Sequence, residues 1–362
     1  MAEPLKNQFF QQTFFEAMGG KIQDHYSHWS NKEFFRLIYT SDWEDMELKQ
    51  RMKHASLALG KCLPAEYDKA IVILQQSLPD QARFEGLLYS EYVQHHGMKQ
   101  PELSLAALEL FTQYGSAEFA IRPFIMEHES ITMKQMLQWT QSENVHVRRL
   151  ASEGCRPRLP WAPALPKFKS NPAPVMAILD KLKEDPELYV RKSVANNLND
   201  ITKDHPDVVI KYLREWNKKA TANIRWITKQ ALRGLIKAGD SDALALVGIH
   251  PAKALVSDLD LPTIVSFGEK FKIKFRLSNL ESKPCAFLVD YVVHHQKANG
   301  TLTPKIFKLG NYQLKAEETI AIEKQHAFIL ITTRKYYAGE HKISIQVNGK
   351  ILAEKPFILE ID

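Results

Sequence analysis

Two runs determine how this chain is interpreted: SENVHVRRLASEGCRPRLPWAPAL at residues 142–165 and DPELYVRKSVANNLNDITKDHP at residues 185–206. Each contains a helix-like stretch in which a Val-Arg pair is followed by polar residues and a carboxylate. A third run, NIRWITKQAL at residues 223–232, repeats the pattern, so that equivalent arginines stand at Arg148, Arg191 and Arg225. Spacings of this size are typical of stacked helical hairpins of the HEAT kind. We therefore predict an α-helical HEAT-like repeat solenoid.

A proline-rich segment, CRPRLPWAPALP, separates the first two runs. Its four prolines forbid a helix and favour extended backbone, which predicts an insertion within one repeat. Basic residues crowd around Trp161 in this region: Arg148, Arg149, Arg156, Arg158, Lys167 and Lys169. Basic groups interleaved with an aromatic ring suit a polyanion that carries bases or sugars to stack on. A solvated surface loop is the alternative that composition leaves open.

The second run begins with good helix-start residues, Asp185 as N-cap and Pro186 as the first helical residue. Helical spacing then puts Val190, Val194 and Leu198 on the core side. Asp200 falls on another face of this helix, and we expect that face to line the concave groove of the solenoid.

Periodicity changes along the chain from helical to alternating. Residues 1–140 show apolar groups at helical spacing throughout, whereas KFKIKFRLSN at residues 270–279 alternates apolar and basic residues as a half-buried strand does. The pairs Asn299-Gly300 and Asn348-Gly349 are turn signals. About 110 residues with six or seven short strands indicate an immunoglobulin-like β-sandwich. We therefore predict two domains, a helical-repeat domain at residues 1–252 and an all-β sandwich at residues 253–362.

Composition narrows the class of protein. The chain has 362 residues and a net charge of +6, and the charge is uneven: residues 1–140 carry a net −5 and residues 141–240 a net +8. A basic middle segment points to a localised anionic partner, of which nucleic acid is the commonest. Three widely spaced cysteines argue against a disulfide framework or a zinc site. Neither a membrane span nor a signal peptide is evident, so we expect a cytoplasmic protein.

Three motifs carry a resemblance to a known family: SAEFAIRPFI at 116–125, VRRLASEGCRPRLPWAPAL at 147–165 and YVRKSVANNLNDITKDHP at 189–206. They closely resemble the AlkC branch of the AlkC/AlkD superfamily of HEAT-repeat DNA glycosylases, some of which end in an immunoglobulin-like domain. The resemblance implies excision of the cationic bases 3-methyladenine and 3-methylcytosine from double-stranded DNA without base flipping. It further implies a monofunctional enzyme that leaves an abasic site. We expect a monomer that needs no cofactor and no metal.

The resemblance places the family's carboxylates at Glu118, Glu153 and Asp200. An N3-alkylated base already carries positive charge, so it leaves with little acid catalysis. Positive charge then builds on the deoxyribose, and a preorganised carboxylate stabilises that state and orients the attacking water. For each carboxylate the alternative is an ordinary ion pair on a helix surface.

The resemblance also implies a set of residues that hold the duplex. The predicted DNA-binding residues are Arg148, Arg149, Arg156, Arg158, Trp161, Arg191, Lys192, Lys297 and Arg334. His294, His295 and Lys335 are further candidates from the β domain. Phosphate contacts of this kind position DNA without reading its sequence. A structural role in repeat packing is the alternative for Arg191 and Arg225, and packing of the proline-rich loop is the alternative for Trp161.

Two other functions compete with the glycosylase interpretation. One is a HEAT-repeat protein that binds DNA lesions without catalysis, and the other is a HEAT-repeat adaptor for proteins. The positive middle segment speaks against the adaptor. Release of a methylated base from DNA distinguishes all three functions.

Overall fold

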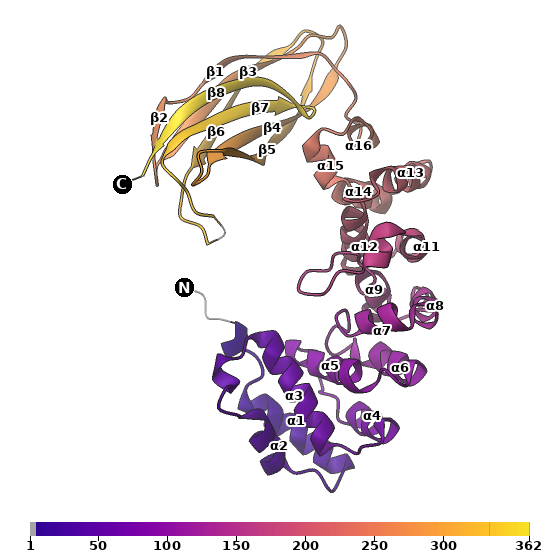
Figure 1. The fold of residues 1–362 in the computed structure, drawn as a ribbon. Coiled ribbons are helices and arrows are strands. Elements are labelled where there is room, and N and C mark those ends of the chain that lie inside the picture. The colour runs from indigo at the N-terminus through magenta and orange to yellow at the C-terminus, as the bar shows by residue number, and fades with distance from the viewer. Residues whose placement is uncertain (1–4, 333, 362) are drawn as a thin grey trace. The chain divides into compact units, whose positions relative to one another are not determined.

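The computed structural model describes residues 5–332 and 334–361, which begin with helices and end with strands (Figure 1). The helices are α1 (Gln12–His25), α2 (Asn31–Ile38), α3 (Leu48–Cys62), α4 (Tyr67–Gln76), α5 (Leu87–His96), α6 (Pro101–Phe111), α7 (Ile121–Glu127), α8 (Glu129–Trp139), α9 (Val145–Glu153), α10 (Pro166–Ser170), α11 (Ala173–Leu182), α12 (Leu188–Ile201), α13 (Pro206–Asn217), α14 (Ala222–Ala231), α15 (Arg233–Ala238) and α16 (Ser241–Leu246). The strands are β1 (Ala254–Asp260), β2 (Ile264–Ser266), β3 (Lys270–Asn279), β4 (Cys285–Gln296), β5 (Leu302–Leu314), β6 (Thr319–Ala327), β7 (Gly339–Val347) and β8 (Lys350–Glu360). This order confirms the predicted fold class, a helical part followed by a β-rich part.

Two layers are formed by helices α4–α9, α11, α12 and α14. On one side α4, α6, α8 and α11 pack on one another in succession, and on the other side α12 contacts both α9 and α14 (Figure 1). The pairs α8–α9 and α11–α12 are the helical hairpins that the arginine spacing predicts. Each layer buries its apolar stripe against the other, so neighbouring hairpins share one continuous core.

Helix α12 confirms the predicted core row, because Val190, Val194 and Leu198 are all fully buried. Its start differs from the prediction: the helix begins at Leu188 with Glu187 as N-cap. Asp185 lies two residues before this N-cap, and its carboxylate accepts a hydrogen bond of 2.9 Å from the backbone N–H of Glu187. The Asp185 side chain therefore fixes the turn that leads into the helix.

Small residues let α9 approach its neighbours closely. The hydroxyl groups of Ser152 on α9 and Ser193 on α12 are 2.7 Å apart, and the Asn197 side chain donates to the Ser152 carbonyl at 2.8 Å. On the other side, a Cβ added to Gly154 would lie 2.6 Å from a methyl carbon of Ile121. These contacts set the end of α9 against both α12 and the start of α7, and the candidate site lies there.

The strands form a sandwich of two sheets, with orders β1-β3-β6 and β2-β8-β7-β4-β5. β3 alternates exposed and buried residues over most of its length, as the sequence predicts. Phe271, Ile273, Phe275 and Leu277 point into a core shared by both sheets. Apart from the parallel pair β2–β8, the paired strands are antiparallel.

The predicted Asn-Gly hairpin connects β7 and β8. Asn348 and Gly349 both have positive φ, 46° and 80°, as the two central residues of a tight hairpin turn require. Helix α15 packs on this turn: a Cβ added to Gly239 would lie 2.6 Å from the Gly349 Cα atom, and the Gln346 side chain donates to the Lys237 carbonyl at 3.0 Å. The short helices that precede β1 are thus tied to the sandwich.

The chain divides into two compact units. The first ends at Val209 and also includes Ala222–Ala231; the second consists of Ile210–Thr221 and the chain from Leu232 onward. β1 begins at Ala254, but α15 and α16 belong to the second unit. The domain boundary between residues 252 and 253 stays a prediction. None of the described helices combines the length and the apolar character needed to span a bilayer.

Candidate active site

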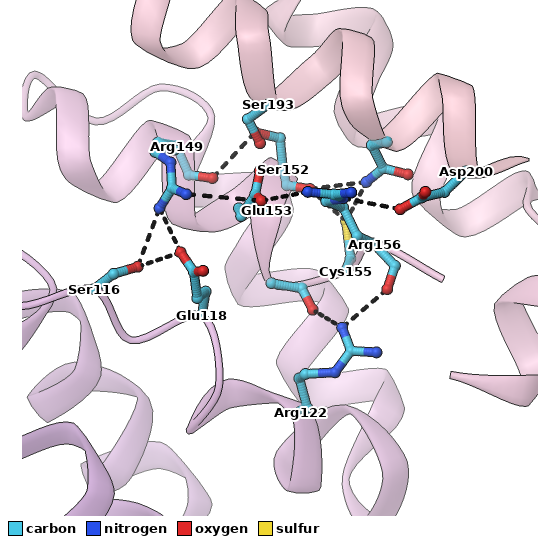
Figure 2. A network of polar contacts seen from close by, with 12 residues as sticks. Ser116, Glu118, Arg122, Arg149, Ser152, Glu153, Cys155, Arg156, Ser193 and Asp200 are labelled. Carbon is cyan, nitrogen blue, oxygen red and sulfur yellow. Dashed lines mark hydrogen bonds and ion pairs between the residues drawn. The ribbon is translucent and has the colours of Figure 1, made fainter. Parts of the chain in front are cut away.

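Three segments of the first unit bring the predicted carboxylates together (Figure 2). Glu118 lies in the turn that leads into α7, Glu153 is the last residue of α9, and Asp200 stands near the end of α12. The close contact of α9 with α12 and with the start of α7 therefore places all three within one polar cluster.

The cluster is a chain of alternating charges (Figure 2). The Arg149 guanidinium donates to Glu118 at 2.6 Å and lies 3.7 Å from Glu153. Arg156 donates to Glu153 at 2.6 Å and to Asp200 at 2.9 Å. The Ser116 hydroxyl also donates to Glu118, at 2.7 Å. Each of the three carboxylates is thus oriented by at least one arginine.

The ion pairs of this cluster are buried, so the attraction between their opposite charges is weakly screened by solvent. Glu153, Arg156 and Asp200 are all buried, and the side chain of Arg149 is 15% exposed. Burial alone would lower the pKa of the Arg149 guanidinium, but the charges of Glu118 and Glu153 outweigh it and raise that pKa. The pKa of Arg156 is likewise raised because Glu153 and Asp200 outweigh its burial. Removing one partner of such a pair leaves a buried charge uncompensated.

A cavity of about 350 Å³ opens beside the cluster. Glu118 and Glu153 belong to its wall, together with Arg156, Phe119 and the exposed Trp161. Carboxylates on the wall of an open cavity can face a cation that develops there and can take a proton from a water molecule.

Asp200 is placed differently from what the sequence predicts. It is only 4% exposed and is not among the described residues that line the cavity. Its carboxylate lies behind Arg156, to which it is paired. Helical periodicity assigns Asp200 to a face of α12, but it does not reveal that Arg156 covers this face.

The proline-rich loop is held by a buried arginine that the sequence analysis missed. Arg122, on α7, donates to the carbonyl groups of Gly154, Arg156 and Pro163 at 2.5–3.0 Å. Burial lowers the pKa of its guanidinium to about 10. Three carbonyls bound by one rigid side chain fix the start and the end of the loop that carries Arg156 and Trp161. An arginine within the apolar run IRPFI at residues 121–125 is the signal that could have revealed it.

Comparison with known proteins agrees with this arrangement. The sequence model described as DNA alkylation repair enzyme matches residues 91–235, and the model described as the C-terminal Ig-like domain of uncharacterised protein YhaZ matches residues 255–361. The uncharacterized protein YhaZ of Bacillus subtilis (strain 168) is 38% identical over 332 residues, which are 91% of this chain and 92% of that protein. The alkylpurine DNA glycosylase AlkC of Pseudomonas fluorescens, solved bound to DNA containing an abasic site analog, is 36% identical. It matches with a TM-score of 0.93 over 99% of this chain and 100% of that chain.

The chain belongs to the AlkC branch of the DNA alkylation repair enzyme family. Both halves of the chain take part in the likeness, because the match to AlkC extends through the immunoglobulin-like domain.

Within this AlkC-type fold, several of the predicted DNA-binding arginines have partners inside the protein. Arg148 forms a two-bond ion pair with Asp185, at 2.6 and 3.2 Å, which braces α9 against the turn before α12. Arg158 pairs with Asp204, and Arg191 donates to the backbone carbonyls of Asp185 and Pro186. These contacts give the three arginines a structural task, and their role as phosphate ligands stays a prediction.

The other predicted contacts differ in accessibility. Lys192 and Lys297 are exposed, and Arg334 is half-buried. The role of these three residues in DNA binding stays a prediction. His295, in contrast, is buried in the sandwich core, and neither ring nitrogen has a hydrogen-bond partner among the described residues. A DNA contact for His295 is therefore a wrong prediction. Alternation along β4 could have assigned its side chain to the inner face.

The described residues include no group of three or more His, Cys, Asp or Glu side chains arranged to hold a metal ion. Cys155, beside Glu153, is fully buried, and burial raises the pKa of its thiol to about 12. A thiol in this state is a poor nucleophile. Cys155 is also not among the described residues that line the cavity, whereas Glu118 and Glu153 are.

Proposed function

We propose that this protein is a DNA glycosylase that hydrolyses the N-glycosidic bond of cationic alkylated bases, 3-methyladenine and 3-methylcytosine, in duplex DNA. The observation that carries the proposal is the position of Glu118 and Glu153 on the wall of one cavity, where Arg149 and Arg156 orient their carboxylates. The likeness to AlkC, an alkylpurine DNA glycosylase, supports it.

The chemistry suits such a site. As the bond from C1′ to the cationic base breaks, the electron pair moves to the base and neutralises it, while positive charge builds on the sugar. A carboxylate fixed near that sugar stabilises the charge, and one preorganised electrostatic partner contributes about 3–4 kcal/mol. Water then forms the new bond to C1′ and passes its proton to Glu118 or Glu153. The reaction is monofunctional and leaves an abasic site.

Duplex DNA is the partner in this proposal. Exposed basic residues such as Lys192 and Lys297 contribute phosphate contacts, which position the duplex without reading its sequence. Retention of the damaged base in the helical stack rests on the family resemblance and stays a prediction.

Base release from methylated duplex DNA tests the proposal. We expect the protein to release 3-methyladenine with a chelator present and no nucleotide added. Glu118→Gln and Glu153→Gln should each lower the single-turnover rate about a hundredfold, the loss of one electrostatic partner. Glu129→Gln is the matched control, because Glu129 is a carboxylate paired with a surface lysine, Lys167.

Three results would contradict the proposal. Tight lesion binding without base release would indicate a non-catalytic lesion-binding protein. Loss of activity in chelator would show that the chemistry needs a metal. Full activity in both cavity variants would remove the carboxylates from the reaction.

A further inference from the structure

Trp161 has an unusual backbone conformation for an aromatic residue. Its φ is 64°, in the left-handed region that bulky L-residues rarely adopt, and its side chain is 62% exposed. The residue lies at the cavity that Glu118 and Glu153 line. Such a conformation persists only where the surrounding structure fixes it, and it tends to occur at functional sites.

A lysine from a distant helix holds this residue. Lys49, the second residue of α3, lies 112 positions earlier in the sequence, yet its ammonium donates to the Trp161 carbonyl at 2.5 Å. The same ammonium lies 4.5 Å from the centroid of the Phe119 ring. Phe119 follows Glu118 directly, so one charge contacts both segments that flank the cavity.

The charge of the Lys49 ammonium has no acidic partner in the part of the chain that the structure describes. Among the described residues, no carboxylate forms an ion pair with it. A hydrogen bond to a carbonyl and a contact with an aromatic face are therefore the interactions that the structure assigns to this charge, and both belong to the cavity rim.

We propose that Lys49 is a positioning residue of the glycosylase: its hydrogen bond keeps Trp161 in the left-handed conformation, so that the indole stands at the cavity rim and stacks on a nucleobase of the substrate. The inference rests on the function proposed above and adds the N-terminal helices to the site. An indole offers a large flat face, and stacking on it is independent of base identity. Arg122 fixes the ends of the loop, whereas Lys49 fixes its tip.

Single-turnover base release from methylated duplex DNA tests the inference. Lys49→Met keeps the aliphatic stem and removes the ammonium, so we expect the maximal rate to fall about tenfold, the loss of one charge-assisted hydrogen bond. Lys49→Arg keeps a donor and should restore most of the rate. Lys53→Met, on an exposed lysine of the same helix, is the matched control and should leave the rate unchanged.

A double-mutant cycle shows whether Lys49 acts through Trp161. In the Trp161→Ala background, Lys49→Met should have no further effect on the rate. An equal loss in both backgrounds would overturn the inference. A rate in Lys49→Met equal to the rate in Lys53→Met would also overturn it. So would a flatter salt dependence of DNA binding in Lys49→Met that persists in the Trp161→Ala background, because Lys49 would then be a phosphate ligand.

Fluorine NMR with 5-fluorotryptophan gives a readout that does not depend on activity. The chain has six tryptophans, and Trp161→Phe identifies the resonance of Trp161. Lys49→Met should shift or broaden that resonance alone, and unchanged spectra would overturn the inference. If the parent protein releases no base, the proposed function fails, while the spectra still decide whether Lys49 positions Trp161.

Discussion

Arg156 and Asp200 meet in an ion pair of 2.9 Å in which both side chains are less than a tenth exposed. The same guanidinium binds Glu153 on the cavity wall at 2.6 Å. Asp200 therefore acts on the cavity through Arg156, by fixing the guanidinium that orients Glu153.

Replacing Asp200 by Asn keeps the shape of the side chain and deletes its charge. We expect the single-turnover rate of base release to fall about a hundredfold, because Arg156 loses the partner that fixes it beside Glu153 and the preorganisation of that carboxylate is lost. DNA binding should hold, because Asp200 is buried and is not among the described residues that line the cavity. Asp204→Asn, which alters the neighbouring pair with Arg158, is the control. Poor binding combined with the parental rate for the bound fraction would show that Asp200 does not position the cavity carboxylate Glu153.

Arg156 should matter for stability first. Arg156→Ala leaves the buried Glu153 and Asp200 carboxylates without their shared partner, so we expect the free energy of unfolding to fall by about 3–5 kcal/mol. Urea unfolding measures this loss. Unchanged stability together with a flatter salt dependence of DNA binding would instead make Arg156 a phosphate ligand.

Lys192 is exposed, and its removal should change DNA binding and not stability. Each phosphate contact contributes about 0.9 to the slope of log affinity against log salt concentration. We expect Lys192→Ala to flatten the slope by roughly this amount. Lys53→Met is the lysine control, and its slope should equal that of the parent protein. If Lys192→Ala also kept the parental slope, Lys192 would not contact DNA phosphates.

The sequence predicts those features that depend on local spacing. The buried row of Val190, Val194 and Leu198, the alternation of β3 and the Asn348-Gly349 turn all follow from helical or strand periodicity and turn chemistry. Periodicity assigns a residue to a face of its own element. It does not show what another element places over that face.

The site differs from expectation where partners lie far apart in the sequence. The pairs Arg148–Asp185 and Arg158–Asp204 join residues 37 and 46 positions apart, and no local pattern in one sequence links them. The basic segment that predicts a phosphate-binding surface is therefore partly neutralised within the protein. The hydrogen bond between Lys49 and Trp161 could not be predicted for the same reason, because these residues are 112 positions apart.

The β-sandwich should lose stability in acid because its core holds neutral histidines. Burial lowers the pKa of His295 to about 3 and that of His326 to about 4. In the unfolded chain these rings take up a proton near pH 6.5. Between pH 6.5 and about 4 the unfolded state therefore binds more protons than the folded state. The contribution of these histidines to the free energy of unfolding is complete above pH 6.5 and is lost as the pH falls below that value.

His295→Phe tests this pH dependence, because Phe fits the ring cluster with Phe328 and Tyr336 and does not titrate. We expect the acid unfolding midpoint to move to lower pH, measured by near-ultraviolet circular dichroism. His250→Phe is the control on an exposed histidine of the same unit. A midpoint that stays at the parental pH in His295→Phe would show that His295 does not control acid stability.

The backbone conformation of Trp161 predicts which of two variants, Trp161→Gly or Trp161→Ala, is the more stable. At ordinary positions Gly is less stable than Ala, because Gly loses more conformational freedom on folding. At a φ of 64° the order should reverse, since a Cβ in the left-handed region costs about 1–2 kcal/mol and Gly has none. We therefore expect Trp161→Gly to be more stable than Trp161→Ala by about 1 kcal/mol in urea unfolding.

Both variants lack the indole and should lose base release equally, so the difference between them reports the backbone alone. Ala164→Gly is the matched control, because Ala164 lies in the same loop and is not among the described residues with positive φ. It should be destabilised in the ordinary way. If Trp161→Gly were the less stable of the two variants, the backbone at Trp161 would not be left-handed in solution, and the hydrogen bond from Lys49 would have no strained conformation to maintain.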